Sequence, residues 1–301
     1  LARSYGVPMI VGLQQLPIVP SPTLGLLDVE EGTLVFNPDQ QMLQAFEQRF
    51  KRSQDSRQVQ QRMLAQPLFS DDGEAIRISV NLADIDELTA IEPSQCDGIG
   101  LVRTEFLLHD QAAIRSEEQQ FRTYRKIMQW AADKPVSFRL FDLGGDKPVA
   151  GITTNDSNPY LGIRGIRLLL QQPDLLRTQL RALLRASVYG ELKIIVPMVT
   201  VAEEMMQVRL LLDQLYDELL SQDKGDSQKA LKPKALKPKL GMMVEVPCAA
   251  ICPELFDSDF YAIGSNDLVQ YVMACSRESD VLASLGKPDN PAVLSLISSV
   301  V

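Results

Sequence analysis

The sequence has few of the residues that most often carry metal binding or nucleophilic catalysis. Its 301 residues include one histidine, His109, which we expect in a surface loop rather than in a catalytic role. Four cysteines stand in or beside apolar runs: Cys96, Cys248, Cys252 and Cys275. With a single histidine in the chain, a zinc centre is not indicated. We expect buried thiols in a reducing, cytoplasmic compartment.

Long apolar runs and an excess of positive charge are also missing. No run reaches the roughly 18 residues of a membrane span, and no signal peptide opens the chain. The net charge of −9 argues against a general binder of nucleic acid or of membrane surfaces. Hydrophobic residues make up 45% of the chain, which allows a sizeable core and excludes wholesale disorder.

From Ala75 onward, strand and helix patterns alternate, which is typical of a parallel α/β fold. Short apolar runs predict strands at 76–81, 98–102, 136–141, 192–197, 241–246 and 260–264. Helices are predicted at 84–91, 116–132, 159–170 continuing to 187, 201–220, 247–255, 268–274 and 291–297. Asn158-Pro159 supplies the start of the third helix. This order predicts a (β/α)8 TIM-type barrel, truncated after about six strands.

Two segments precede the barrel, which we assign to residues 75–301 and expect to be incomplete at its C-terminus. Residues 1–38 are too few to form a core alone, so we expect the tail of a β-rich domain. Its β-prone pieces are 9–11, 26–29 and 34–36, with a turn at Glu31-Gly32. Residues 39–74 carry a narrow apolar stripe at helical spacing. This stripe predicts a mostly solvated linker helix, with disorder as the alternative.

One segment interrupts the alternation. Residues 229–239 read KALKPKALKPK, in which the pentad Ala-Leu-Lys-Pro-Lys occurs twice. The prolines exclude a helix, and the lysines favour solvent. We predict an inserted surface loop, with a basic docking peptide as the alternative.

Two carboxylates follow the apolar runs of the last two predicted strands: Glu245 comes after Met242–Val244, and Asp267 comes after Phe260–Ile263. A carboxylate beside a buried apolar strand needs a compensating charge. At the carboxyl ends of parallel barrel strands, a metal or a cationic substrate group commonly supplies it. Two acids there can hold one Mg²⁺ and leave most of its ligand shell to water and phosphate. The alternative is that each acid caps the helix that follows it.

Cationic side chains recur near the same strand ends. Their positions are Arg103, Arg139, Lys147, Arg164 and Arg277, and a turn with two glycines precedes Lys147. Guanidinium groups bind phosphate and carboxylate in a bidentate manner, and glycine turns let backbone amides approach an anion. The set predicts an anion pocket facing a two-carboxylate metal site, as in phosphoryl-transfer enzymes. Each arginine alone is also a candidate salt-bridge partner, Arg139 for the nearby Asp142.

Several motifs resemble, in the same order, those of the phosphoenolpyruvate-utilising enzymes, in particular Enzyme I of the bacterial phosphotransferase system (phosphoenolpyruvate–protein phosphotransferase). The motifs are GIGLVRTEFLL, FRLFDLGGDKP, NPYLGIRGIR, IIVPMVT, GMMVEVPCAA and AIGSNDLVQY. The opening LARSYGVPMIVG is similar to the stretch just after that family's phosphohistidine. This similarity implies that residues 1–38 are the C-terminal remnant of a phosphohistidine swivelling domain.

The resemblance also implies ligands, partners and site residues. It implies Mg²⁺ on Glu245 and Asp267. The implied phosphoenolpyruvate contacts are Arg103, Arg139, Lys147, Arg164, Asn266 and Arg277. The family's phosphoryl group passes to a histidine on the swivelling domain and then to a histidine-containing phosphocarrier protein. Barrels of this family commonly form homodimers, so a homodimer is expected.

Some expected features fall outside the chain or differ from the family's pattern. The acceptor histidine is expected before Leu1, and the cysteine that protonates the enolpyruvate is expected past Val301. We therefore predict no catalytic residue within the chain and no turnover by the chain alone. SRESD, residues 276–280, stands where the family has a DRGN-like stretch. The alternatives are the same barrel in a pyruvate phosphate dikinase or phosphoenolpyruvate synthase, and a non-catalytic regulatory relative.

Overall fold

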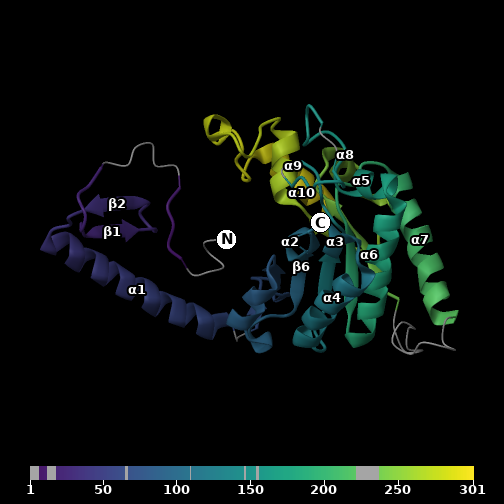
Figure 1. Cartoon of the computed structure of the whole chain (residues 1–301), viewed down its shortest axis with the longest axis horizontal. Coiled ribbons are helices and arrows are strands. Elements are labelled where there is room, and N and C mark those ends of the chain that lie inside the picture. Colours follow the sequence, from purple (N-terminus) through teal and green to yellow (C-terminus); the bar gives the residue numbers. More distant parts are fainter. Residues whose placement is uncertain are drawn as a thin grey trace. The chain divides into compact units, whose positions relative to one another are not determined.

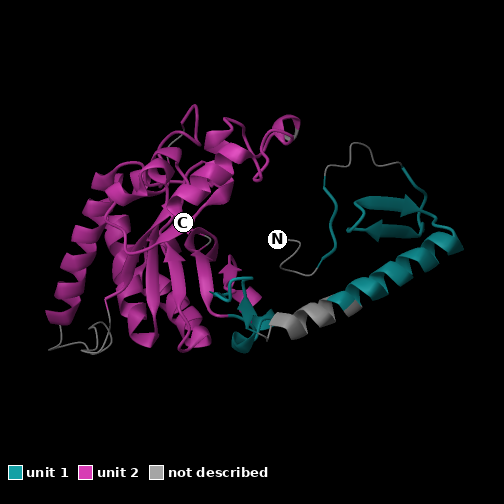
Figure 2. Cartoon of the chain, turned by 180° about the vertical axis from the view of Figure 1, so that it is seen from behind, with its two compact units in different colours: residues 1–77, 89–96 teal, residues 78–88, 97–301 magenta. Residues whose placement is uncertain are grey.

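The computed structural model describes residues 7–11, 18–64, 67–108, 110–145, 147–153, 156–221 and 237–301. The chain forms two compact units, which Figure 2 colours separately. The first unit is residues 1–77 with 89–96, and the second is residues 78–88 with 97–301. The predictions for His109 and for most of the repeated pentad fall outside the described residues.

The first unit contains a small hairpin followed by a long helix. β1 (Gly25–Asp28) pairs antiparallel with β2 (Thr33–Phe36), which confirms the predicted turn between them. The helix predicted within residues 39–74 is also confirmed, as α1 (Gln40–Leu64). Asp28 ends β1 as a buried carboxylate, and Arg49 of α1 pairs with it at 2.7 Å. This ion pair fixes the helix against the hairpin that precedes it.

The second unit is built on one parallel sheet, which curls as in part of a barrel (Figure 1). Its strands are β5 (Val80–Leu82), β6 (Ile99–Arg103), β7 (Val136–Arg139), β8 (Leu192–Val196), β9 (Lys239–Val244) and β10 (Tyr261–Ile263). They lie side by side in chain order, and every neighbouring pair is parallel. This is the strand arrangement of a (β/α)8 barrel, so the predicted fold class is confirmed.

Two of the predicted strands differ from the structure. Residues 9–11 form no strand, because no described segment pairs with them and an unpaired strand leaves its backbone groups without partners. The run predicted at 76–81 is divided. Its first residue belongs to β4 (Ala75–Ile76), which forms a hairpin with β3 (Leu68–Phe69), and the parallel sheet begins at β5.

Helical segments connect the strands. They are η1 (Ile85–Ala90), η2 (Pro93–Gln95), α2 (Thr104–Leu107), α3 (Gln111–Arg115), α4 (Glu117–Ala131), α5 (Ile166–Gln171), α6 (Pro173–Ala186), η3 (Ser187–Tyr189), α7 (Ala202–Ser221), α8 (Pro247–Ile251), η4 (Pro253–Leu255), α9 (Ser265–Val272), η5 (Asp280–Leu282) and α10 (Pro291–Val300). Helices α4, α6 and α7 are neighbours along the sheet (Figure 1). Among the helices that the structure describes, none combines the length and apolar content that crossing a membrane requires.

The helix start predicted at Asn158-Pro159 is wrong. Turns follow this dipeptide, and α5 begins only at Ile166, after Gly165 with a φ of 55°. A Cβ at position 165 would lie 2.9 Å from the Cβ of Met198, so both space and backbone conformation favour glycine there. The segment before Gly165 is therefore a loop, and it ends in Arg164.

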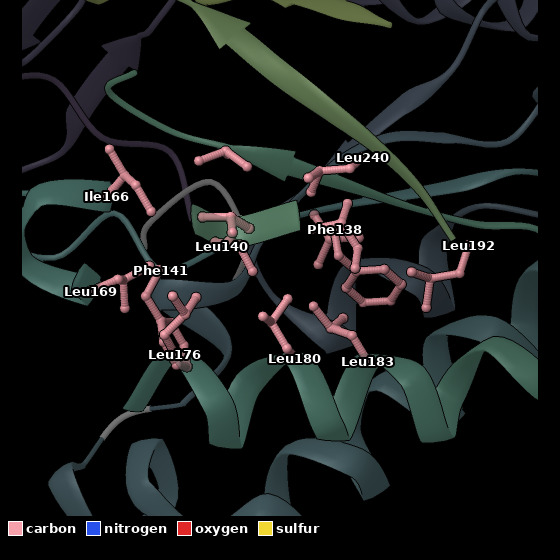
Figure 3. Packing of buried hydrophobic residues seen from close by; sticks show 14 of the residues in the cluster. Phe138, Leu140, Phe141, Ile166, Leu169, Leu176, Leu180, Leu183, Leu192 and Leu240 are labelled. Carbon is pink, nitrogen blue, oxygen red and sulfur yellow. The ribbon is translucent and has the colours of Figure 1, made fainter. Parts of the chain in front are cut away.

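The core of the second unit lies between the sheet and its helices. In Figure 3, leucines of α6 point toward the aromatic and aliphatic side chains of β7 and the residues after it. The labelled residues include Leu176, Leu180 and Leu183 of α6, and Phe138, Leu140 and Phe141. All of these side chains are buried, and each contributes about 1.5–3 kcal/mol relative to an exposed position. This packing holds the end of β7 firmly against α6.

Candidate active site

The carboxyl ends of the parallel strands bring the predicted charged residues together. β6 ends at Arg103 and β7 at Arg139, and these two residues are partners in the strand register. Glu245 follows β9 directly, and Asp267 lies in the first turn of α9, just past β10. Because these strands are parallel, all four residues lie at the same edge of the sheet, where barrel enzymes carry their sites.

Asp142 is the centre of a buried group of charges, and three cations pair with it. The two Oδ atoms of Asp142 accept hydrogen bonds from Nη2 of Arg164 at 3.1 and 3.0 Å. Nζ of Lys147 lies 3.2 Å and Nη2 of Arg139 lies 3.4 Å from Oδ2. Burial alone raises the pKa of Asp142, but the three cations outweigh it and hold that pKa well below its usual range. Asp142 is therefore ionised.

Glu105 is a second carboxylate in this group, and the sequence analysis did not assign it. It accepts hydrogen bonds from Nη2 of Arg139 and, at 3.0 Å, from Nζ of Lys147. Its Oε2 atom and Nε of Arg139 are buried and have no hydrogen-bond partner within the described residues. The signal that finds Glu245, an acid just past an apolar strand, also applies to Glu105. We name Glu105, Arg139, Asp142, Lys147 and Arg164 the Asp142 cluster.

Backbone hydrogen bonds hold the two-glycine turn before Lys147 in a fixed conformation. Gly144 and Lys147 exchange backbone hydrogen bonds of 3.1 and 3.0 Å, which close a tight turn. Gly144 has a φ of 99°, and a Cβ there would lie 2.7 Å from the carbonyl oxygen of Ile163. Glycine at this position therefore admits the loop that carries Arg164.

Asp267 links α9 to the Asp142 cluster. Its Oδ1 atom accepts a hydrogen bond from Nη1 of Arg164 at 3.1 Å, and its Oδ2 atom lies 3.5 Å from Nη1 of Arg277. Tyr271 of α9 adds another link, because its hydroxyl accepts a hydrogen bond from Arg164 and donates one to the carbonyl oxygen of Tyr160. Tyr271 was not predicted from the sequence, because it lies within α9 and not at the end of a strand.

The cations of the site fall into two groups by exposure. The side chains of Arg139, Lys147 and Arg164 are 5%, 11% and 0% exposed. Those of Arg103 and Arg277 are 36% and 28% exposed. Asn266 is also exposed, in the first turn of α9. The structure thus places the predicted anion-binding residues at one edge, but only some of them face solvent.

Glu245 differs from the other carboxylates. Its side chain is buried, and Oε1 accepts a 2.6 Å hydrogen bond from the backbone N–H of Met198, a residue with a φ of 57°. Within the described residues, Glu245 forms no ion pair. Burial, followed by the negative charges of Asp142 and Asp267, raises the pKa of Glu245 to about 8, although Arg139 opposes the shift. Among the described residues, Glu245 is therefore a buried acid without a direct cationic partner.

The alternative role of the two acids as helix caps is wrong. α8, which follows Glu245, has Val246 at its N-cap position, and no side chain caps its first turn. α9 has Gly264 at that position, again with no side-chain cap, and Asp267 lies inside the helix. Both carboxylates instead point to partners on other elements, namely Met198 for Glu245 and arginines for Asp267.

The thiols differ in part from their predicted burial. All four cysteines are free. Cys96 and Cys275 are buried as predicted, whereas Cys248 is exposed and Cys252 is partly exposed. Cys248 lies near the start of α8, where its Sγ atom contacts the carbonyl oxygen of Thr200 at 3.2 Å. Within α8, Ala249 and Ala250 are buried, whereas Cys248 lies on the exposed side of the helix.

Comparison with known proteins agrees with the motifs. Residues 57–301 match the family described as "PEP-utilising enzyme, PEP-binding domain". The whole chain is 35% identical to phosphoenolpyruvate-protein phosphotransferases of Bacillus sp. (strain S) and Geobacillus stearothermophilus, and 31% identical to that of Bacillus subtilis (strain 168). It covers 51%, 51% and 52% of these proteins, so the chain spans about half the length of its curated relatives. The chain therefore belongs to the family of phosphoenolpyruvate-utilising enzymes and carries their phosphoenolpyruvate-binding domain.

Proposed function

We propose that this chain is the phosphoenolpyruvate-binding part of a phosphoenolpyruvate–protein phosphotransferase. That enzyme moves the phosphoryl group of phosphoenolpyruvate to a histidine and from there to a phosphocarrier protein. The names of the relatives support this assignment over a dikinase or a synthase. The observation that carries the proposal is the buried Glu245, which forms no ion pair within the described residues, at the same sheet edge as the partly exposed Arg103 and Arg277.

Glu245 and Asp267 fit the Mg²⁺ that this function requires. Both are at least nine-tenths buried, and the negative charge of Asp267 helps to raise the pKa of Glu245. A divalent cation would compensate Glu245, which forms no ion pair in the part of the chain that the structure describes. Within the described residues, no three side chains of His, Cys, Asp and Glu form a metal-binding group. A two-carboxylate site suits Mg²⁺, because this ion usually keeps several waters and binds substrate phosphate.

The cations have different tasks in this proposal. Arg103 and Arg277, which are partly exposed, bind the phosphate and carboxylate of phosphoenolpyruvate together with Asn266. Arg139, Lys147 and Arg164 hold the carboxylates of the Asp142 cluster in place and supply positive charge beneath the ligand. When bound, Mg²⁺ neutralises charge on the phosphoryl oxygens. We assign no catalytic nucleophile or acid within the chain.

The remaining proposals concern the setting of the site. A histidine-containing phosphocarrier protein as partner and a homodimer follow from the family resemblance. The four free thiols support a reducing compartment such as the cytoplasm. Whether the pathway serves sugar transport or a nitrogen-related branch depends on the carrier that the enzyme recognises.

Isothermal titration of the purified chain with phosphoenolpyruvate tests the proposal. We expect saturable binding in the presence of Mg²⁺ and much weaker binding in the presence of EDTA. Pyruvate, which lacks the phosphate, serves as the control ligand and should not bind at the same concentrations. Equal affinity with and without Mg²⁺, or no binding of phosphoenolpyruvate, would contradict the proposed function.

A further inference from the structure

One polar residue interrupts the apolar face that α6 turns toward the sheet. Leu176, Leu180 and Leu183 occupy this face (Figure 3), and Gln179 lies among them at helical spacing. Its side chain is fully buried. A buried amide needs hydrogen-bond partners, because an unpaired one is costly. The partners of Gln179 identify its role.

Gln179 connects the ends of two neighbouring strands. Its Nε2 atom donates to the hydroxyl of Thr104 at 3.0 Å, and its Oε1 atom accepts from the backbone N–H of Phe141 at 3.0 Å. Thr104 in turn donates to the carbonyl oxygen of Arg139 at 2.7 Å. One side chain thus joins the residue just past β6 to the segment just past β7.

These attachment points are the backbone supports of the charged site. Thr104 lies between Arg103 and Glu105, and Phe141 directly precedes Asp142. A displacement of either segment would therefore move an anion-binding arginine or a carboxylate of the Asp142 cluster. We propose that Gln179 is a positioning residue for phosphoenolpyruvate, which sets the spacing between the β6 and β7 ends without touching the ligand. This inference rests on the proposed function.

The same hydrogen-bond network contains a matched control. Gln120 of α4 is also fully buried, donates from Nε2 to the carbonyl oxygen of Ile114 at 2.6 Å, and accepts from the Tyr124 hydroxyl at 3.1 Å. The Tyr124 hydroxyl also receives a 3.3 Å hydrogen bond from Gln179. The two glutamines share residue type, burial and a common partner, but only Gln179 contacts the strand ends.

The test compares Gln179→Met with Gln120→Met. Methionine is chosen because it keeps the volume of the side chain and removes both its hydrogen-bond donor and its acceptor. Thermal unfolding should show a similar loss of stability in the two variants. Titration with phosphoenolpyruvate and Mg²⁺ should show wild-type affinity for Gln120→Met. For Gln179→Met we expect an affinity about 10-fold to 100-fold lower, the range for residues that orient a site's direct ligands.

Equal affinities of the two variants would overturn the inference while leaving the proposed function intact. A wild-type chain that does not bind phosphoenolpyruvate would overturn both. If Gln179→Met does not fold, a second pair decides. Thr104→Val removes the hydroxyl that links Gln179 to the carbonyl oxygen of Arg139, and Thr104→Ser retains it. We expect weakened binding for Thr104→Val and recovery for Thr104→Ser, and the same affinity in both variants would overturn the inference.

Discussion

Asp142 and Glu245 are both buried carboxylates near the carboxyl ends of parallel strands, but their surroundings differ. Arg139, Lys147 and Arg164 surround Asp142, and its pKa is held below the usual range. Glu245 has one backbone hydrogen bond and no ion pair within the described residues, and its pKa is raised to about 8. The paired acid organises the protein's own cations, whereas the uncompensated acid is suited to an added cation.

The largest effect is expected from neutralising the paired acid. Asp142→Asn leaves the cations of the cluster without their shared counter-charge in a buried place. Breaking one partner of a buried ion pair costs about 3–5 kcal/mol, so the free energy of unfolding should fall by about that amount. Denaturant titration measures this change.

The exposed pair of Asp213 with Lys237 provides the control for that substitution. Its N–O distance is 2.5 Å, and the side chains are 44% and 37% exposed. Asp213→Asn should change the free energy of unfolding by about 1 kcal/mol or less, since exposed pairs contribute little. Similar losses for Asp142→Asn and Asp213→Asn would show that the Asp142 cluster is not a buried, cooperative support.

In the absence of metal, ionised Glu245 should lower the stability of the folded protein, whereas ionised Asp142 raises it. Its pKa rises from an ordinary 4.5 to about 8, so the folded protein keeps it protonated where the unfolded chain ionises it. The stability from this group is present below pH 4.5 and is lost as the pH rises to about 8. Glu245→Gln should not show this loss of stability with rising pH, because the glutamine side chain does not ionise.

Unfolding of both proteins in EDTA between pH 4.5 and 8 tests this prediction. The wild type should lose up to about 1.4 kcal/mol per pH unit relative to Glu245→Gln. The difference between the two curves isolates Glu245 from the other titrating groups. Parallel curves would contradict the raised pKa and the absence of a cationic partner.

A smaller effect should separate the partly exposed cations from the buried ones. Arg103→Lys keeps the charge but loses the bidentate geometry, so the free energy of phosphoenolpyruvate binding should weaken by about 1–3 kcal/mol. Stability should change by about 0.5 kcal/mol or less, because the Arg103 side chain is 36% exposed. Arg139→Lys should lower stability as well, since Arg139 pairs with Glu105 and Asp142. Equal stability of Arg103→Lys and Arg139→Lys would contradict the distinction between partly exposed and buried cations.

The parts of the fold predicted from the sequence are those set by local pattern. Apolar runs bounded by glycine, proline or charge predicted the parallel strands, and the order of these runs indicated the barrel type. The strand at 76–81 was misplaced because local pattern does not show that Ala75–Ile76 pairs with Leu68–Phe69. The Asn-Pro dipeptide is a valid local helix signal, but the conformation of Gly165 delays α5.

The sequence predicted most of the charged residues that belong to the site, but not which of them form ion pairs. Strand-end positions indicated Glu245, Asp267, Arg103 and Arg139, and the structure brings them to one edge. Which arginine pairs with which acid depends on distant contacts, such as the 34-residue separation of Arg139 and Glu105. Sequence pattern therefore identified most of the charged groups, though not Glu105, and could not show that Glu245 forms no ion pair within the described residues.

Titration of Mg²⁺-dependent phosphoenolpyruvate binding in Glu245→Gln decides whether Glu245 is a ligand of the metal. The glutamine side chain keeps an acceptor for the Met198 N–H group, so the fold should be retained while the charged metal ligand is lost. We expect the wild type to bind phosphoenolpyruvate with Mg²⁺ and the variant to lose most of this affinity. Unchanged Mg²⁺-dependent affinity in a folded Glu245→Gln variant would contradict this expectation and would remove Glu245 from the metal site.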